Sequence, residues 1–87
     1  MGVRDLSELE VRVASVLALG GELRKKIINI AATRSPAAVY GLAEAILRTH
    51  GFVSREAESI AKACRWLAII RRDYGQAEFD RITAEQK

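Results

Sequence analysis

The chain has 87 residues, enough for one domain, and 49% of them are hydrophobic, which is typical of globular proteins and too high for a disordered one. Its 14 lysines and arginines exceed its 11 acidic residues, so the net charge is a mildly basic +3. The chain has one cysteine, Cys64, and one histidine, His50, which excludes a disulfide scaffold and a four-ligand zinc module. We expect one helical domain over residues 1–87, with residues 1–5 and 85–87 frayed.

The sequence contains no long apolar segment. No run approaches the roughly 20 apolar residues that a membrane-spanning helix needs, and residues 1–5 lack the apolar stretch of a secretory signal. Together with a single cysteine, these features favour a reducing, cytoplasmic location without membrane contact. We predict no cofactor and no metal.

Apolar residues recur at helical spacing through most of the chain, and this predicts an all-α fold, a compact bundle of four to five short helices. The predicted helices cover residues 7–19, 22–33, 36–49, 55–74 and 77–84. The count is four if Gly20-Gly21 only bends the first segment instead of ending it. Residues 11–19 could also form a strand, although a capping signature at Ser7 favours a helix.

Each predicted helix has an apolar stripe that should face the core. In the helix 36–49, the stripe consists of Val39, Leu42, Ala43 and Ile46. In the helix 55–74, it consists of Ala57, Ile60, Ala61, Cys64, Leu67 and Ala68. The helix 55–74 is also apolar on its opposite side in its second half, so we expect it to lie at the centre of the bundle.

That opposite side carries the one tryptophan of the chain. Trp66 points away from Cys64, and Ile69 and Ile70 flank it. Either other helices cover this side, or a second copy or a partner protein does, because exposed apolar patches usually mark interfaces. We predict a homo-oligomer, most simply a dimer. The preceding helix offers a second candidate contact, a side of small residues: Ala38, Gly41 and Ala45.

Residues that could perform catalysis do not converge. His50 sits at a predicted helix C-terminus, where the helix dipole favours a cation, and Cys64 belongs to a core stripe. Glu56 and Glu58 are two residues apart and therefore do not share a helix face. We predict that the protein is not an enzyme.

Basic residues form two groups that could contact the phosphates of DNA or RNA: Arg24, Lys25 and Lys26, and Arg55, Lys62 and Arg65. Three cations near the positive end of a helix are mildly unfavourable on their own, which indicates an anionic partner or nearby carboxylates, those of Glu22 and Asp5. Such contacts would position a nucleic acid without reading its sequence.

The junction between the third and fourth predicted helices resembles the opening of a helix-turn-helix. A helix ends before Gly51, and a second begins after Ser54 with Arg55. Against this, Trp66 and its neighbouring isoleucines share the side that would face the groove, and Glu56 and Glu58 would repel phosphates. We assign no family on this junction.

These observations predict a small non-catalytic helical binding protein. Its predicted role is that of a subunit or regulator in a nucleic-acid-handling complex, with phosphate contacts through its basic helix faces. The alternative is a protein–protein adaptor or self-assembling bundle with no nucleic-acid role, built on the Trp66 side.

Overall fold

A computed structural model describes residues 6–84, which form six α-helices and contain no β-strand. In chain order they are α1 (Leu6–Arg12), α2 (Ala14–Leu17), α3 (Gly21–Thr33), α4 (Pro36–Thr49), α5 (Ser54–Tyr74) and α6 (Gln76–Thr83). The all-α prediction is therefore confirmed. The predicted fraying at 1–5 and 85–87 lies outside the described residues.

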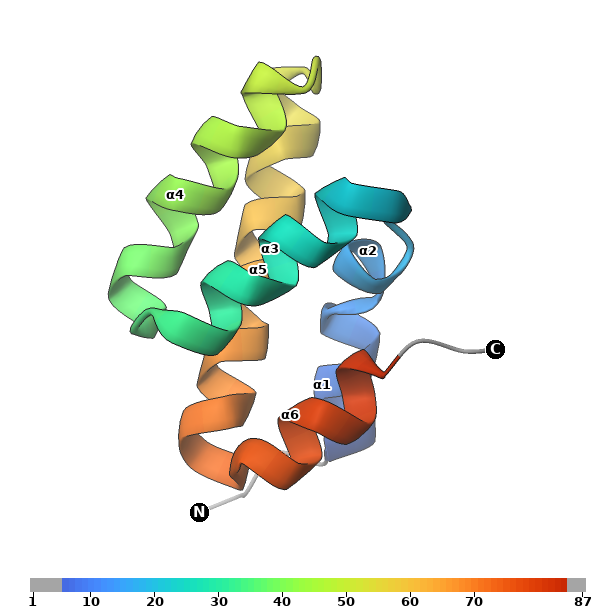
Figure 1. Ribbon diagram of the computed structural model, residues 1–87, viewed down its shortest axis with the longest axis vertical. Helices are drawn as coiled ribbons and strands as arrows, with labels where there is room; N and C mark the ends of the chain where they lie inside the picture. The colour runs from blue at the N-terminus through green and yellow to red at the C-terminus, as the bar shows by residue number, and fades with distance from the viewer. Residues whose placement is uncertain (1–5, 85–87) are drawn as a thin grey trace.

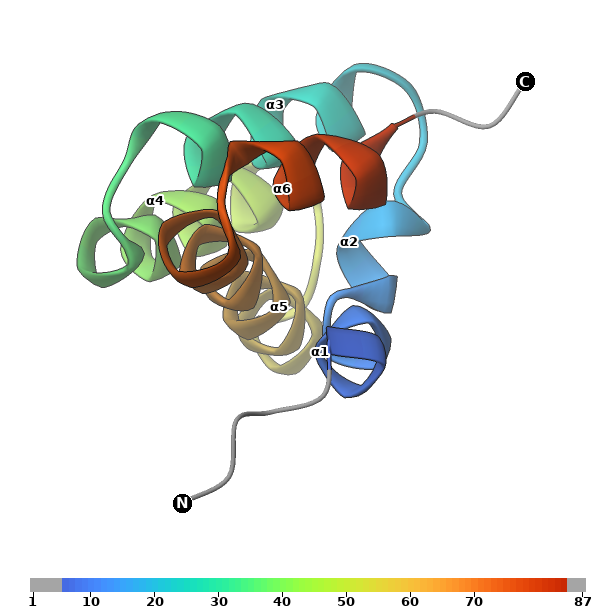
Figure 2. The same cartoon turned by 90° about the horizontal axis from the view of Figure 1, so that it is seen from below.

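The helices lie in two layers. The shortest extent of the molecule is 21 Å, about twice the ~10 Å diameter of a helix. One layer holds α3 and α6, and the other holds α1, α4 and α5, as the view from below shows (Figure 2). Within residues 6–84, no helix is both long enough and apolar enough to span a lipid bilayer.

The longest helix, α5, lies at the centre and contacts each of the other five described helices, as predicted. Its most extensive contact is with α4, which runs beside it in the opposite direction (Figure 1). This antiparallel pair differs from a helix-turn-helix, whose helices cross at a steep angle of about 90–120°. The junction at Gly51 therefore closes a helical hairpin.

The helix predicted at 7–19 is interrupted at Val13. The backbone there has φ −101° and ψ 4°, so α1 ends at Arg12 and α2 starts at Ala14. The break changes the direction of the chain, and the apolar residues Leu9, Val13 and Val16 on both sides of it are all buried. The described residues therefore carry one helix more than the upper predicted count.

Gly20-Gly21 ends this segment and does not merely bend it. Gly20 precedes α3 in an extended conformation, and Gly21, the first residue of α3, has a φ of +59°, which strains other residues. At the far end of α5, Gly75 has a φ of +99° and separates α5 from α6. Both breaks follow the glycines of the sequence.

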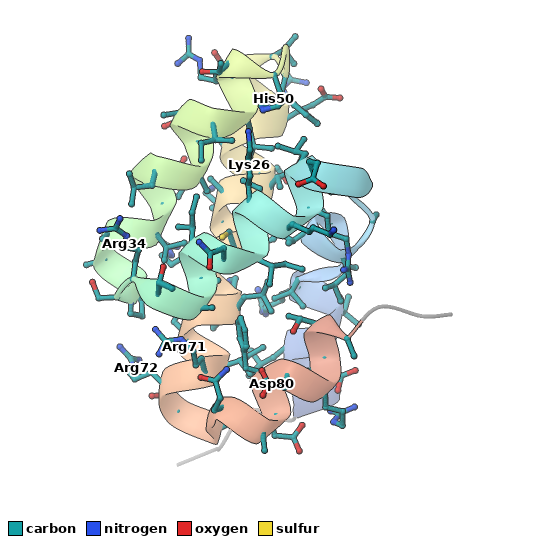
Figure 3. All side chains as sticks on the ribbon, viewed as in Figure 1. Lys26, Arg34, His50, Arg71, Arg72 and Asp80 are labelled. Carbon is teal, nitrogen blue, oxygen red and sulfur yellow. The ribbon has the colours of Figure 1, made fainter. Side chains whose placement is uncertain are left out.

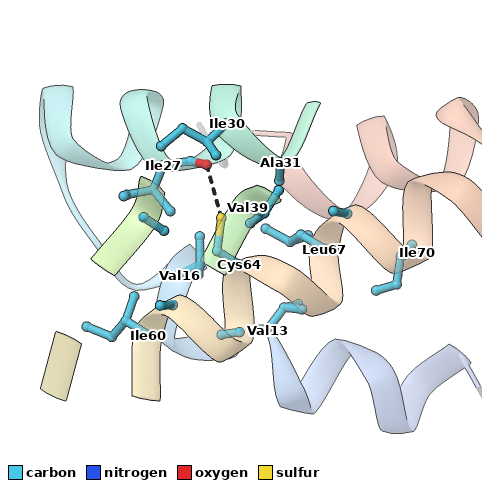
Figure 4. Packing of buried hydrophobic residues seen from close by; sticks show 14 of the residues in the cluster. Val13, Val16, Ile27, Ile30, Ala31, Val39, Ile60, Cys64, Leu67 and Ile70 are labelled. Carbon is cyan, nitrogen blue, oxygen red and sulfur yellow. Dashed lines mark hydrogen bonds between the residues drawn. The ribbon is translucent and has the colours of Figure 1, made fainter. Parts of the chain in front are cut away.

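The core lies between the two layers, and the predicted stripe of α5 faces it (Figure 4). All six residues of that stripe are buried. On α4 the prediction was partly wrong, because Leu42 is 41% exposed while Leu47 is fully buried. Helix α4 carries bulky apolar residues on several sides, and its packing against α3 and α5 turns Val39, Ala43 and Leu47 inward.

One arginine side chain forms hydrogen bonds between the two layers. The Arg71 guanidinium of α5 donates hydrogen bonds of 3.0 Å to the carbonyl of Ala31 and 3.0 Å to that of Arg34. These carbonyls lie at the C-terminal end of α3, where the last turn leaves acceptors without helical partners. Arg71 therefore satisfies the end of α3 from the neighbouring layer (Figure 3).

Candidate interaction surface

One side of α5 faces away from the layer of α3 and α6 (Figure 2). Its residues recur at helical spacing, mostly three or four positions apart, and are exposed or half-buried. We call this side the open face of α5: Arg55, Glu58, Lys62, Arg65, Trp66, Ile69, Arg72 and Asp73. Among the described helices, α4 borders it on one side and α1 on the other.

Each border is marked by an arginine that stacks on an aromatic ring. The Arg12 guanidinium of α1 lies 5.2 Å from the centre of the Trp66 ring, and the Arg65 guanidinium lies 5.8 Å from the centre of the Tyr40 ring of α4. Such cation–π contacts contribute about 0.5–1 kcal/mol each at exposed sites. Trp66 is therefore half-buried by its own chain, packed against the core and partly covered by Arg12.

Charges on α4 and α5 meet around Tyr40. Partial burial raises the pKa of the Tyr40 phenol above its ordinary value, and the carboxylates of Glu44 and Glu58 raise it further, while the Arg65 guanidinium opposes them. Two acidic and one basic side chain thus surround this ring. The border with α4 is mixed in charge, and so is the open face.

Ile70 does not belong to this surface, which corrects the prediction. It is fully buried and points toward α1 (Figure 4), whereas Ile69 remains half-buried on the open face. The reason is that α1 packs against the Ile70 side of α5. Of the predicted apolar patch, only Trp66 and Ile69 remain accessible.

The first basic group divides among three environments. The Arg24 guanidinium donates to the carbonyls of Leu17, at 3.3 Å, and Thr83, at 3.2 Å, which are the last residues of α2 and α6. Lys25 forms an exposed ion pair of 3.7 Å with Glu22. Lys26 is exposed, and its side chain points toward His50 (Figure 3). Fold contacts thus account for the position of Arg24, while phosphate contacts by these three residues stay a prediction.

The second basic group, Arg55, Lys62 and Arg65, lies on the open face of α5. The six predicted phosphate contacts therefore come from two helices, α3 in one layer and α5 in the other. The open face also includes Glu58 and Asp73, and Asp73 accepts a hydrogen bond of 2.8 Å from Arg72. Phosphate contacts by Arg55, Lys62 and Arg65 stay a prediction.

The small-residue side of α4 is exposed along its length: Ala38, Gly41 and Ala45. Leu42, at 41% exposure, borders it. Its role as a contact surface stays a prediction.

Cys64 and His50 lie apart, with Cys64 fully buried in the core and His50 exposed at the end of α4. The Cys64 thiol donates a hydrogen bond of 3.3 Å to the carbonyl of Ile27, and burial raises its pKa to about 12. A thiol in this state is not a nucleophile near neutral pH. Within residues 6–84, no group of three or more His, Cys, Asp or Glu side chains could hold a metal ion.

Five residues of this surface were not assigned to a site from the sequence: Arg12, Tyr40, Glu58 as a charge partner, Arg72 and Asp73. The seven-residue spacing of Glu58, Arg65 and Arg72 could have revealed two of them, because it places all three on one helix face. Arg12 and Tyr40 gave no such signal, because they come from other helices.

Comparison with known proteins adds no assignment to this surface: no protein family, no curated protein and no solved structure matches the chain.

Proposed function

We propose that this protein is a non-catalytic interaction protein that pairs with a second copy of itself through the open face of α5. The observation that carries the proposal is the order of charges along that face. A base and an acid, Arg55 and Glu58, stand near its N-terminal end, and Arg72 and Asp73 stand near its C-terminal end.

In an antiparallel pair, the partner helix presents the same charges in the reverse order. Glu58 and Arg72 are equally far from position 65, so a two-fold axis at that position sets Glu58 of one copy level with Arg72 of the other. The same axis brings Arg55 to within about one helical turn of Asp73 of the second copy. Opposite charges therefore meet at both ends of the pair.

The middle of the face supplies the apolar contact. Lys62 of one copy comes within one residue of the level of Ile69 of the other, where its aliphatic stem can cover the isoleucine. Trp66 lies one residue from the axis, and aromatic side chains of this kind dominate the energetics of many interfaces. Arg65 is at the axis position itself, and its guanidinium is turned aside onto the Tyr40 ring of α4, which keeps it from facing the Arg65 of the second copy directly. Half-buried Trp66 and Ile69 would lose their remaining water contact there.

The same face suits a nucleic acid less well. Glu58 and Asp73 interrupt its cations, and acidic groups repel backbone phosphates. The remaining predicted contacts of the first basic group lie on the other layer. A pair joined through α5 would moreover cover Arg55, Lys62 and Arg65.

The test is a charge exchange read by sedimentation velocity across a range of concentrations. Glu58→Arg alone sets Arg opposite Arg72, and Arg72→Glu alone sets Glu opposite Glu58, so each single variant should be monomeric. Mixing the two variants restores both opposite-charge pairs, and we expect the mixture to form heterodimers. The double variant, which carries both changes, should pair with itself.

Glu56→Arg is the matched control, because Glu56 is exposed on α5 but lies off the open face. This variant should pair like the unchanged protein. Pairing that survives both single reversals would place the interface elsewhere, and a chain that stays monomeric up to roughly millimolar concentration would refute self-association. Micromolar binding of random duplex DNA that weakens by orders of magnitude between roughly 50 and 200 mM salt would support the nucleic-acid function instead.

A further inference from the structure

A hollow of about 380 Å³ lies between α3 and α4, and none of its lining residues belongs to the open face of α5. Ala45 and Ile46 of α4 give it an apolar lining, and Lys26, Thr49 and His50 complete it. Figure 3 shows the Lys26 side chain pointing toward His50. Two basic side chains from different helices thus border one small apolar depression.

These two side chains differ from their basic neighbours in what they contact. Arg24 is held by helix-end carbonyls, and Lys25 is paired with Glu22. Within residues 6–84, the side chains of Lys26 and His50 take part in no ion pair and no hydrogen bond. None of the residues that line the hollow is acidic.

The residues around the hollow favour one kind of anion, a single carboxylate, over a chain of phosphates. A nucleic-acid backbone carries phosphates at regular intervals and needs further cations beside the first. Next to this hollow, α4 presents the small or apolar exposed residues Gly41 and Leu42, and Arg48 is the one cation of that helix. A single carboxylate with an apolar side chain beside it matches one cationic spot with an apolar lining.

We propose that this hollow binds an acidic segment of another protein, with one Asp or Glu carboxylate held between Lys26 and His50. An apolar side chain of the same segment lies on Ala45 and Ile46. The Thr49 hydroxyl already donates to the carbonyl of Ala45, at 2.9 Å, so its oxygen faces the ligand as an acceptor only. The carboxylate therefore depends on Lys26 and His50 for its donors.

The test uses the full chain labelled with ¹⁵N and a synthetic amphipathic peptide of alternating Leu and Glu pairs. We expect amide shifts centred on the residues that line the hollow, and a dissociation constant at least tenfold higher for Lys26→Glu. His50→Gln should weaken binding by several-fold. Lys25→Glu is the matched control, because Lys25 is adjacent, exposed and outside this hollow, and it should stay within about twofold.

Three outcomes would overturn the proposal: shifts centred elsewhere, unchanged affinity in Lys26→Glu, or equal binding of the same peptide with Gln in place of Glu. Duplex DNA that binds at the hollow more tightly than the peptide would reassign the site to phosphate. The Glu58→Arg variant separates this site from the proposed pairing, because it should bind the peptide normally whether or not it forms dimers. Lys26 is exposed, so the unfolding curve of Lys26→Glu should match that of the unchanged protein.

Discussion

The two sides of α5 differ in the size of their side chains, which are mostly small on one side and mostly large on the other. The side that faces the core is built largely from small residues: Ala57, Ala61, Ala63, Cys64 and Ala68. The open face instead carries Arg65, Trp66, Ile69 and Arg72. The small residues let α3 and α4 pack closely against the core side of α5. The large side chains of α5 lie mainly on its open face. A central helix can thus be tightly packed within its own chain and still offer a large surface to a partner.

We expect the largest loss of stability from truncating the one leucine in the buried stripe of α5. Leu67 is fully buried, and Leu67→Ala should lower the free energy of unfolding by about 2–5 kcal/mol, because it removes apolar contacts and leaves a cavity. Urea denaturation followed by circular dichroism measures this.

Leu42→Ala is its matched control, because Leu42 is 41% exposed on α4 and the chemical change is the same. We expect it to cost less than about 1 kcal/mol. Equal losses in the two variants would mean that α5 does not lie at the centre of the fold.

A smaller loss should follow from removing the arginine on the core side of α5. Arg71→Met keeps the aliphatic bulk but leaves the carbonyls of Ala31 and Arg34 without their guanidinium donor. We expect about 1–2 kcal/mol less stability, since a hydrogen bond from a charged group contributes about 1.5–3 kcal/mol and Arg71 is only partly buried.

The exposed Arg34 side chain provides the comparison for this measurement. Arg34→Met should change the midpoint of thermal unfolding by little, since isolated surface charges contribute about 0–1 kcal/mol. If Arg71→Met is as harmless as Arg34→Met, then the layers are held by apolar packing alone.

The contrast within α5 was largely predictable from the sequence. Twenty-one residues form almost six turns, so the helical period separates the stripe that contains Cys64 and Leu67 from the Trp66 side without ambiguity. The prediction for Ile70 was wrong because this residue lies at the edge between the two sides. The position of α1 decides whether such a residue is buried or accessible.

Other features could not be found in this way. Val13 interrupts the first helix although no glycine or proline marks the place, and Leu47 replaces Leu42 in the core because α4 is apolar on several sides. The roles of Arg24 and Arg71 depend on carbonyl acceptors as far as 59 and 40 residues away in the sequence. Local spacing contains no information about such partners.

We expect the smallest change in stability at Gly41, a small residue that is not closely packed. Gly41 is small yet exposed in the middle of α4, and a Cβ atom added there would meet nothing within 4 Å. Gly41→Ala should therefore raise the free energy of unfolding by about 0.5–1 kcal/mol, because glycine loses more conformational freedom in a helix than alanine does. Gly75→Ala, at a φ of +99°, should lower it instead, and thermal unfolding of both variants gives the signs. A loss of stability in Gly41→Ala would mean that another chain packs against this side of α4 in solution, since nothing within residues 6–84 occupies that space.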